Sequence, residues 1–323
     1  MGLAVAIEAR RAGLLARVVD KGALVNSILG YPARMEFFST PDLIEIGGHP
    51  FPTQGYKPTR EEGLEYYRGV AAREGIDVRL YERVTAVNGR QGDFVVETSR
   101  GVHRAGNVVV ATGFFDVPNR LGVPGEDLPH VTHYYREPFP YVQQRVVVIG
   151  ARNSAAKAAL DCYRHGAKVT MVVRSPALSE TVKYWIKPDL ENRIKEGSIR
   201  AYFDSTVAEI GPSSLQLSTP DGPVEIACDF VLAMIGYRPD FGFLADIGIT
   251  FADDGCRTPI FDETTFESER AGVFLAGTVC GGLKTNRWFI ENGRFHARQI
   301  VHHLAGQRTD TIPFAAMHWK TEE

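Results

Sequence analysis

The sequence predicts an α/β fold of two domains, each built around a strand–helix–strand unit and a meander of short strands. Three observations support this prediction. The same order of elements occurs within the first 117 residues and again from residue 145. The stretch between them, residues 118–140, is rich in proline, glycine and histidine, as linkers are. The length of 323 residues suits two domains of ordinary size.

Composition excludes several classes of protein. Hydrophobic residues make up 44% and charged residues 23%, the balance of a globular protein with a core. The net charge of −3 gives no basic surface for nucleic acid, and no run of lysine and arginine suggests a membrane surface. No apolar stretch is long enough to span a membrane, and the N-terminus is a poor signal peptide. We therefore expect a cytoplasmic protein.

The cysteines, at positions 162, 228, 256 and 280, form no Cys-x-x-Cys pair. The sequence therefore supports neither a redox-active dithiol nor a zinc site, and we expect no metal. Four reduced thiols in a cytoplasmic protein are the favoured interpretation.

The first domain begins with a predicted helix. Its apolar residues between Leu3 and Leu14 recur at the spacing that places them on one helix face, and Gly13 ends the helix as its C-cap. A short strand, residues 16–20, follows and ends in Asp20. After a long loop, residues 21–58, a helix is predicted over 59–74, with Thr59 as N-cap and Glu62 completing a capping box. Short strands over 78–81, 84–88, 94–98 and 102–104 form the predicted meander, and a buried strand over 107–111 leads into Thr112 and Gly113.

A strand ahead of the first helix is missing from this plan. Such a strand lies at the centre of the sheet, buried on both faces. Losing four or five of its valine or isoleucine side chains, at about 1.5–3 kcal/mol each, would remove about 6–15 kcal/mol. That approaches the stability of a whole domain, roughly 5–15 kcal/mol. We therefore expect the true start to lie upstream of Met1; the alternative is a truncated pseudo-enzyme.

The second domain carries the sharpest motif. A buried strand, residues 145–149, runs into Gly150, and a helix follows over 153–165. Free backbone N–H groups at such a helix start, together with its dipole, bind a pyrophosphate. The dinucleotide fingerprint asks for glycine at three places, which here hold Gly150, Arg152 and Ala155. Arg152 departs from it, because a side chain there hinders the close approach of the backbone, although its guanidinium suits a phosphate.

The strand over 168–173 ends in Arg174, where enzymes that use NAD place an acid for the ribose hydroxyl. Arginine there suits a 2′-phosphate, so we expect NADPH rather than NADH. In the first domain Asp20 holds the acidic position, which suits the ribose of FAD. A second strand, residues 272–276, ends in Gly277, and a helix starting near Glu291 would place its N-terminus toward the flavin.

Longer segments resemble a known family, the YpdA-type bacillithiol-disulfide reductases within the thioredoxin-reductase-like flavoproteins. The resembling stretches cover nearly the whole chain: residues 24–27, 37–40, 45–48, 57–60, 110–113, 122–130, 182–185, 191–200, 236–240 and 289–296. The family opens with a strand and a Gly-x-Gly-x-x-Gly turn, and Gly2 matches the third of these glycines. The residue before that glycine is cysteine in some members; here it is Met1.

The resemblance implies two Rossmann-like domains, with an NADPH domain inserted into a discontinuous FAD domain. We expect the FAD domain over 1–117 and 241–308, the NADPH domain over 118–240, and a tail over 309–323. The residues expected to bind FAD are Gly2, Asp20, Lys21, Asn26, Ser39, Thr40, Ala111, Thr112, Gly113, Gly277, Thr278, Glu291 and Asn292. Those expected to bind NADPH are Gly150, Arg152, Asn153, Ser154, Ala155, Arg174, Lys183, Gly236 and Tyr237.

The resemblance also implies an activity. NADPH would reduce FAD by hydride transfer, and the electrons would pass to a small disulfide such as bacillithiol disulfide. Two alternatives remain open: a ferredoxin- or flavodoxin-NADP reductase, and a flavin-binding redox sensor with little turnover. The catalytic residue stays open: Cys280 is a weak candidate because free cysteines are more often buried apolar residues, and His130 or His133 could donate a proton but more often such histidines are structural. We expect a homo-oligomer.

Overall fold

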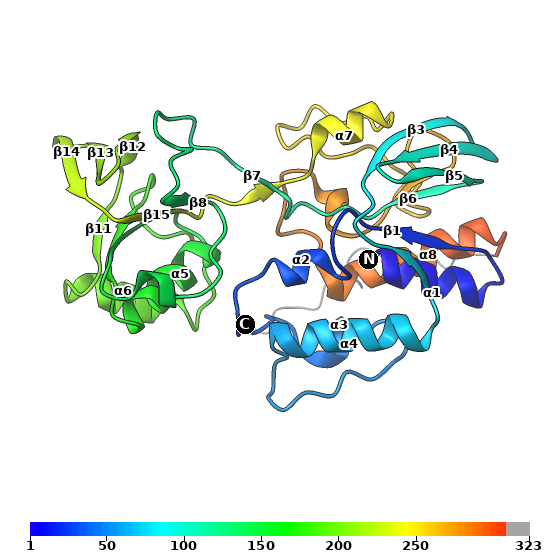
Figure 1. Ribbon diagram of the computed structural model, residues 1–323, viewed down its shortest axis with the longest axis horizontal. Helices are drawn as coiled ribbons and strands as arrows, with labels where there is room; N and C mark the ends of the chain where they lie inside the picture. The colour runs from blue at the N-terminus through cyan, green and yellow to red at the C-terminus, as the bar shows by residue number, and fades with distance from the viewer. Residues whose placement is uncertain (308–323) are drawn as a thin grey trace. The chain divides into compact units, whose positions relative to one another are not determined.

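The computed structural model describes residues 1–307 and divides the chain into two compact units. Unit 1 consists of Met1–Val117 and the part of the chain from Arg238 onward, and unit 2 is the continuous segment Pro118–Tyr237 (Figure 1). The second boundary lies three residues before the one expected from the sequence. The expected tail, residues 309–323, lies outside the described residues. In the described part, no helix has the length and apolar character needed to cross a membrane.

Unit 2 contains a five-stranded parallel sheet in the order β11–β10–β9–β15–β8. Its strands are β8 (Val131–Thr132), β9 (Arg145–Ile149), β10 (Lys168–Val172), β11 (Arg200–Tyr202) and β15 (Phe230–Ala233). Helices α5 (Asn153–Arg164) and α6 (Lys187–Lys195), a 3₁₀ turn η1 (Phe139–Tyr141) and the antiparallel meander β12 (Thr206–Ile210), β13 (Ser214–Thr219) and β14 (Gly222–Ala227) complete the unit. Central strand β9 is buried from Val146 to Ile149, as a strand covered on both faces should be.

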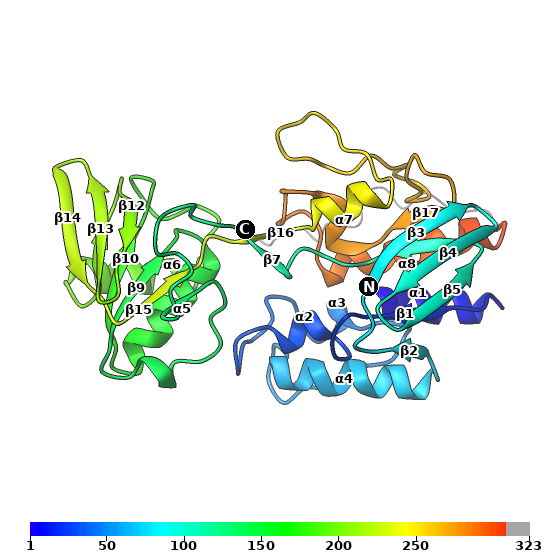
Figure 2. The ribbon, with the colours of Figure 1, turned by 45° about the horizontal axis from the view of Figure 1, so that its top comes forward.

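Unit 1 repeats this plan (Figure 2). Its helices are α1 (Gly2–Arg11), α2 (Asn26–Leu29), α3 (Pro41–Ile44), α4 (Arg60–Arg73), α7 (Phe241–Asp246) and α8 (Ile290–Leu304), with a 3₁₀ turn η2 (Gly277–Gly281). Its strands are β1 (Arg17–Val19), β2 (Asp77–Arg79), the meander β3 (Val84–Arg90), β4 (Asp93–Thr98) and β5 (Gly101–Ala105), then β6 (Val108–Val110) and β17 (Val273–Leu275). The segments at the two boundaries, β7 (Val117–Pro118) and β16 (Tyr237–Arg238), pair with each other.

The parallel sheet of unit 1 is in two halves. Strand β1 pairs in parallel with β2, and β6 pairs in parallel with β17. In unit 2 the corresponding strands β10 and β15 both pair with β9, which lies between them. Among the described residues of unit 1, no strand takes the place of β9. The valines of β1 and the first two valines of β6 are accordingly only half-buried.

Two expectations about local structure are wrong. The strand at residues 77–79 does not belong to the meander, because it pairs in parallel with β1, Val18 opposite Val78. Residues 21–58 are not one loop, since the short helices α2 and α3 lie within them. The capping box that opens α4 is confirmed: the Thr59 hydroxyl accepts from the Glu62 N–H at 3.2 Å, and the Thr59 N–H donates to Glu62 at 2.7 Å.

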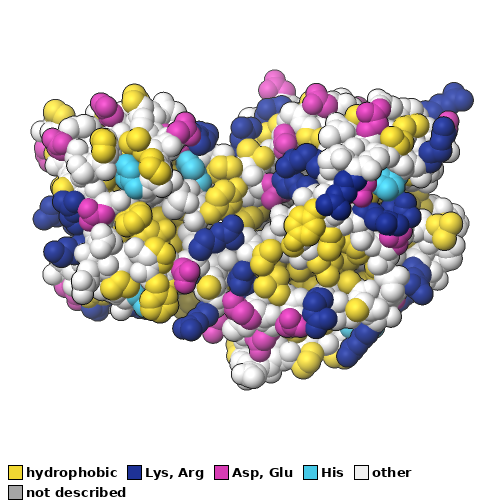
Figure 3. Space-filling model, in the orientation of Figure 1, with side chains coloured by type: hydrophobic (Ala, Val, Ile, Leu, Met, Phe, Trp, Pro, Cys, Tyr) yellow, Lys and Arg dark blue, Asp and Glu magenta, His cyan; other side chains and the backbone are white. Residues whose placement is uncertain are grey.

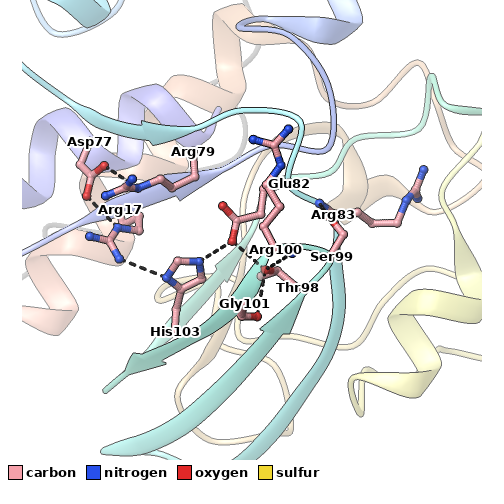
Figure 4. A network of polar contacts seen from close by, with 10 residues as sticks. All are labelled: Arg17, Asp77, Arg79, Glu82, Arg83, Thr98, Ser99, Arg100, Gly101 and His103. Atoms are coloured by element: carbon pink, nitrogen blue, oxygen red, sulfur yellow. Dashed lines mark hydrogen bonds and ion pairs between the residues drawn. The ribbon is translucent and has the colours of Figure 1, made fainter.

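A polar network connects the β1–β2 pair to the meander (Figure 4). Arg17 on β1 donates to Asp77 on β2 at 2.7 Å and contacts His103 on β5 at 3.1 Å. His103 in turn lies 2.6 Å from the buried carboxylate of Glu82, which also accepts from Thr98 on β4. The hydrogen bonds from Thr98 and His103 hold the pKa of Glu82 below its usual value. This half of the sheet is therefore fixed to its neighbour by ionic side chains as well as by packing.

Candidate cofactor-binding sites

The turn between β9 and α5 has the geometry of a dinucleotide turn. Gly150 has a φ of +137°, and a Cβ there would lie 2.5 Å from the carbonyl oxygen of Met234 and 3.1 Å from the Cβ of Ala155. No side chain fits at position 150, and Ala155 is fully buried against it. This packing is compatible with Gly150 and Ala155 as the first and third positions of the dinucleotide fingerprint.

The start of α5 suits a phosphate. Arg152 is its N-cap, with an extended backbone and an exposed side chain, and neither a capping side chain nor an acidic residue occupies the first turn. The backbone N–H groups of Asn153, Ser154 and Ala155 lie at the positive end of the helix. Among the described residues, no side chain caps this end. This combination accepts an anion readily, so the residues present fit the pyrophosphate of a dinucleotide.

Arg174 lies close to this turn along the sheet. The Gly150 N–H donates to the carbonyl of Val172 at 3.0 Å, and the exposed Arg174 follows two residues later. Its place at the end of the strand beside β9 is the one at which a dinucleotide's ribose is recognised. The geometry is compatible with binding a 2′-phosphate through its guanidinium.

The segment after β15 forms a second glycine turn. Gly236 has a φ of +90°, and its carbonyl accepts from the Asn119 N–H at 3.0 Å. The Tyr237 hydroxyl donates to the carbonyl of His133 at 2.9 Å. This turn adjoins the Gly150 turn through Met234. Sequence reasoning missed Asn119, and no pattern marks it, because its partner lies more than a hundred residues away.

In unit 1 several distant segments meet at the start of α1. A Cβ on Gly277 would lie 2.3 Å from Met1 Cγ, and one on Gly293 would lie 2.9 Å from Met1 Sδ. The side chain of Met1 therefore lies against the turn after β17 and the first turn of α8, beside Gly2. Sequence reasoning did not assign Gly293 to the site. Like α5, α1 carries neither a side-chain cap nor an acid in its first turn.

Asp20 directly follows β1 and is half-buried. Its carboxylate accepts from the Gly22 N–H at 2.9 Å, and desolvation raises its pKa. Gly22 packs so closely on the next helix that a Cβ there would be 2.3 Å from Asn26 Oδ1. The ammonium of Lys21 forms an ion pair with Asp116 at 2.8 Å, and the charges of both act on the Asp20 carboxylate.

The turns that follow β6 and β17 lie side by side. Gly113, after Ala111 and Thr112, has a φ of +70°, and a Cβ there would lie 3.2 Å from Thr278 Oγ1. On α8, Glu291 accepts a hydrogen bond from Ser39, the residue before Thr40. The side chain of Asn292 accepts from the Phe289 N–H at 2.6 Å, which fixes the first turn of the helix. Most of the residues expected at the FAD site are therefore linked in one cluster.

This cluster fits FAD. It offers an acid at the end of β1, an uncapped helix start at Gly2, and tight glycine turns with positive φ at 113 and 277. Figure 3 shows hydrophobic side chains gathered on unit 1 around the start of α1 and α2, and an apolar surface of this kind suits a flavin ring.

Cys280 is fully buried, and its Sγ lies 3.8 Å from Nδ1 of His296. Burial raises the pKa of the Cys280 thiol, so it stays protonated and is a poor nucleophile. His296 Nδ1 instead accepts the Gly277 N–H at 3.1 Å, and desolvation lowers the pKa of His296 to about 3. Neutral His296 therefore holds the turn after β17, a role that no sequence pattern announces.

Comparisons with known proteins agree with this geometry. The model of the pyridine nucleotide-disulphide oxidoreductase family matches residues 1–277. Bacilliredoxin reductase Bdr of Bacillus subtilis is 42% identical over 306 residues, which cover 94% of each chain. The structure of bacillithiol disulfide reductase Bdr (YpdA) from Bacillus cereus superposes with a TM-score of 0.91 at 38% identity, covering 94% of this chain and 95% of that one. T. acidophilum thioredoxin reductase, with a TM-score of 0.74 at 20% identity over 94% of both chains, shares the fold.

The resemblance and the α/β fold class predicted from the sequence are thus confirmed, and so are the enzyme class and the two cofactors, FAD and NADPH. The roles of individual residues are not tested by these comparisons. The chain belongs to the pyridine nucleotide-disulphide oxidoreductase family and is an FAD- and NADPH-dependent reductase of the thioredoxin-reductase-like type.

Proposed function

We propose that this chain reduces bacillithiol disulfide with electrons from NADPH. The observation that carries the proposal is the identity of 42% over 94% of the chain to a bacilliredoxin reductase, together with the likeness to a solved bacillithiol disulfide reductase. Bound FAD supplies the two-electron transfer between coenzyme and disulfide. The absence of any Cys-x-x-Cys pair is compatible with this acceptor and equally with the two alternatives, a ferredoxin- or flavodoxin-NADP reductase and a redox sensor.

In unit 2 the proposed task of the chain is to hold NADPH. The amides of Asn153, Ser154 and Ala155 at the α5 start would bind the pyrophosphate, with the guanidinium of Arg152 beside it. Arg174 would bind the 2′-phosphate and so favour NADPH over NADH. Gly150 keeps the turn tight enough for the phosphates to approach the backbone.

In unit 1 the chain would hold FAD through the cluster around α1. The carboxylate of Asp20 would accept a hydrogen bond from the adenosine ribose, and the start of α1 at Gly2 would bind phosphate. The Gly113 and Gly277 turns would lie against the flavin, with α8 starting nearby. The ion pair of Lys21 with Asp116 makes Lys21 the weakest of the expected ligands. We further propose a homo-oligomer that acts in the cytoplasm, where its thiols stay reduced.

The test is an anaerobic reaction of the FAD-loaded protein with NADPH, followed by flavin absorbance. We expect NADPH to bleach the flavin, NADH to do so far more slowly, and bacillithiol disulfide to restore the colour within a catalytic turnover. Glutathione disulfide at the same concentration is the matched control. Fast reoxidation by ferredoxin with none by bacillithiol disulfide would instead establish a ferredoxin reductase. Slow reoxidation by every acceptor would favour a redox sensor.

A further inference from the structure

The loop over residues 179–186 of unit 2 is fastened to the dinucleotide turn by three hydrogen bonds. The Ser179 N–H donates to the carbonyl of Ala151 at 2.9 Å. The side chain of Asn153 makes the other two: its Nδ2 donates to the carbonyl of Thr181 at 2.9 Å, and its Oδ1 accepts from the Lys183 N–H at 3.0 Å. Asn153 thus uses both ends of its amide on this loop and none on capping α5.

The loop is built to present the residues at its centre. Val182 and Ile186 are buried in the core of unit 2 and anchor it on both sides. Between them Lys183 is half-buried, while Tyr184 and Trp185 are 78% and 44% exposed. The Lys183 ammonium lies 5.8 Å from the centre of the Trp185 ring. Exposing two adjacent large aromatic side chains next to an anion-accepting helix start is unusual for a surface that binds nothing.

We infer that Asn153 is a positioning residue, which holds this loop as a wall of the NADPH site and fixes the place of Lys183 beside the coenzyme's phosphates. The inference rests on the proposed function, because it assumes that unit 2 binds NADPH. It assigns Asn153 a different role from the direct contact expected from the sequence. One N–H and the oxygen of the Asn153 amide are bonded to the loop, so we assign Asn153 an action on the ligand through Lys183.

The attachment of the loop to Asn153 has a consequence for the affinity for NADPH. If the loop were loose, binding NADPH would also have to order it, and that cost would weaken affinity. Held by Asn153, the loop is preformed. We call the two hydrogen bonds of the Asn153 side chain to the loop the Asn153 clamp. Loss of the clamp should weaken NADPH binding without slowing the step after binding. It should do so only in a protein that carries Lys183, because Lys183 is the residue that the clamp positions.

The experiment compares Asn153→Ala, Lys183→Met and the double variant, with Asn192→Ala on α6 as the matched control. Asn192 is an exposed asparagine of the same unit, and it lies on α6, outside the loop. Hydrogen exchange in the absence of coenzyme should show a faster-exchanging Lys183 amide in Asn153→Ala and an unchanged one in Asn192→Ala. Acrylamide quenching of Trp185 fluorescence, identified with a Trp185→Phe variant, should rise in the same protein.

Titration with NADPH supplies the second measurement. Asn153→Ala should raise the Kd for NADPH about tenfold through lost preorganisation, with kcat at saturating NADPH unchanged. In the Lys183→Met background the same substitution should change the Kd less than about twofold. Equal costs in both backgrounds, or an unchanged Kd despite a deprotected Lys183 amide, would overturn the inference. If the unaltered protein failed to bind NADPH, the proposed function would fail, while the exchange and quenching data would still report on the clamp.

Discussion

At the scale of the single residue, we propose that Arg174 determines the choice of coenzyme. It is exposed at the end of β10, beside the turn whose Gly150 N–H bonds to that strand. A charge-assisted hydrogen bond to phosphate contributes about 1.5–3 kcal/mol. We expect Arg174→Ala to lose roughly 10- to 150-fold in preference for NADPH over NADH, measured as the ratio of the two kcat/KM values. A variant that keeps the ratio of the unaltered protein would show that another group reads the phosphate.

His296 predicts a dependence of stability on pH. Its pKa is lowered from 6.5 to about 3 by desolvation, so the unfolded chain binds a proton that the folded one does not. The titration of His296 therefore does not affect the free energy of unfolding above pH 6.5. This free energy falls as the pH drops from 6.5 toward 3, by about 1.4 kcal/mol per pH unit. From pH 7 to pH 5 unfolding should therefore become easier by about 2 kcal/mol.

Urea unfolding at several pH values checks this, with His296→Gln as the comparison. Desolvation also lowers the pKa of His133 and acts with the same sign, but that term is present in both proteins and cancels in the difference. The slope between pH 7 and pH 5 should be smaller in His296→Gln. Identical slopes in the two proteins would show that the ring at 296 is already accommodated in its charged form.

At the scale of the element, the divided sheet of unit 1 makes a prediction about stability. Strands β1 and β6 each pair on one side only among the described residues, and their valines are half-buried. A strand placed between them would bury apolar side chains on both faces. We expect that fusing a copy of residues 145–150 and a short turn ahead of Met1 stabilises unit 1 by a few kcal/mol, a rise of roughly 4–12 °C in its unfolding temperature.

The measurement is calorimetry of the fused protein, together with its flavin content after purification. A glycine–serine extension of equal length is the control, because it adds chain without apolar side chains. No difference between the two extensions would mean that the gap between β1 and β6 does not accept a strand.

At the scale of the whole molecule, the sequence predicted what depends on local pattern. The turns at Gly150 and Gly277 were found because a glycine ends a buried strand, and the start of α4 because Thr59 and Glu62 have capping spacing. The predicted pairing of β2 with the meander was wrong, because the sequence of a three-residue strand does not indicate which strand it pairs with. The Asn153 clamp and the placement of His296 join residues 16 to 30 positions apart, and no periodicity records such contacts.

The pairing of β7 with β16 has a consequence for how such a protein can be re-engineered. The chain leaves unit 1 and returns to it through two strands that lie side by side, and the Asn119 N–H donates to the Gly236 carbonyl at 3.0 Å close to the junction. An inserted domain whose two ends are adjacent can be exchanged for another, because the host domain is connected to either insert at the same two positions. A coenzyme module selective for NADH, grafted at these two strands, would leave the flavin module's backbone path unaltered.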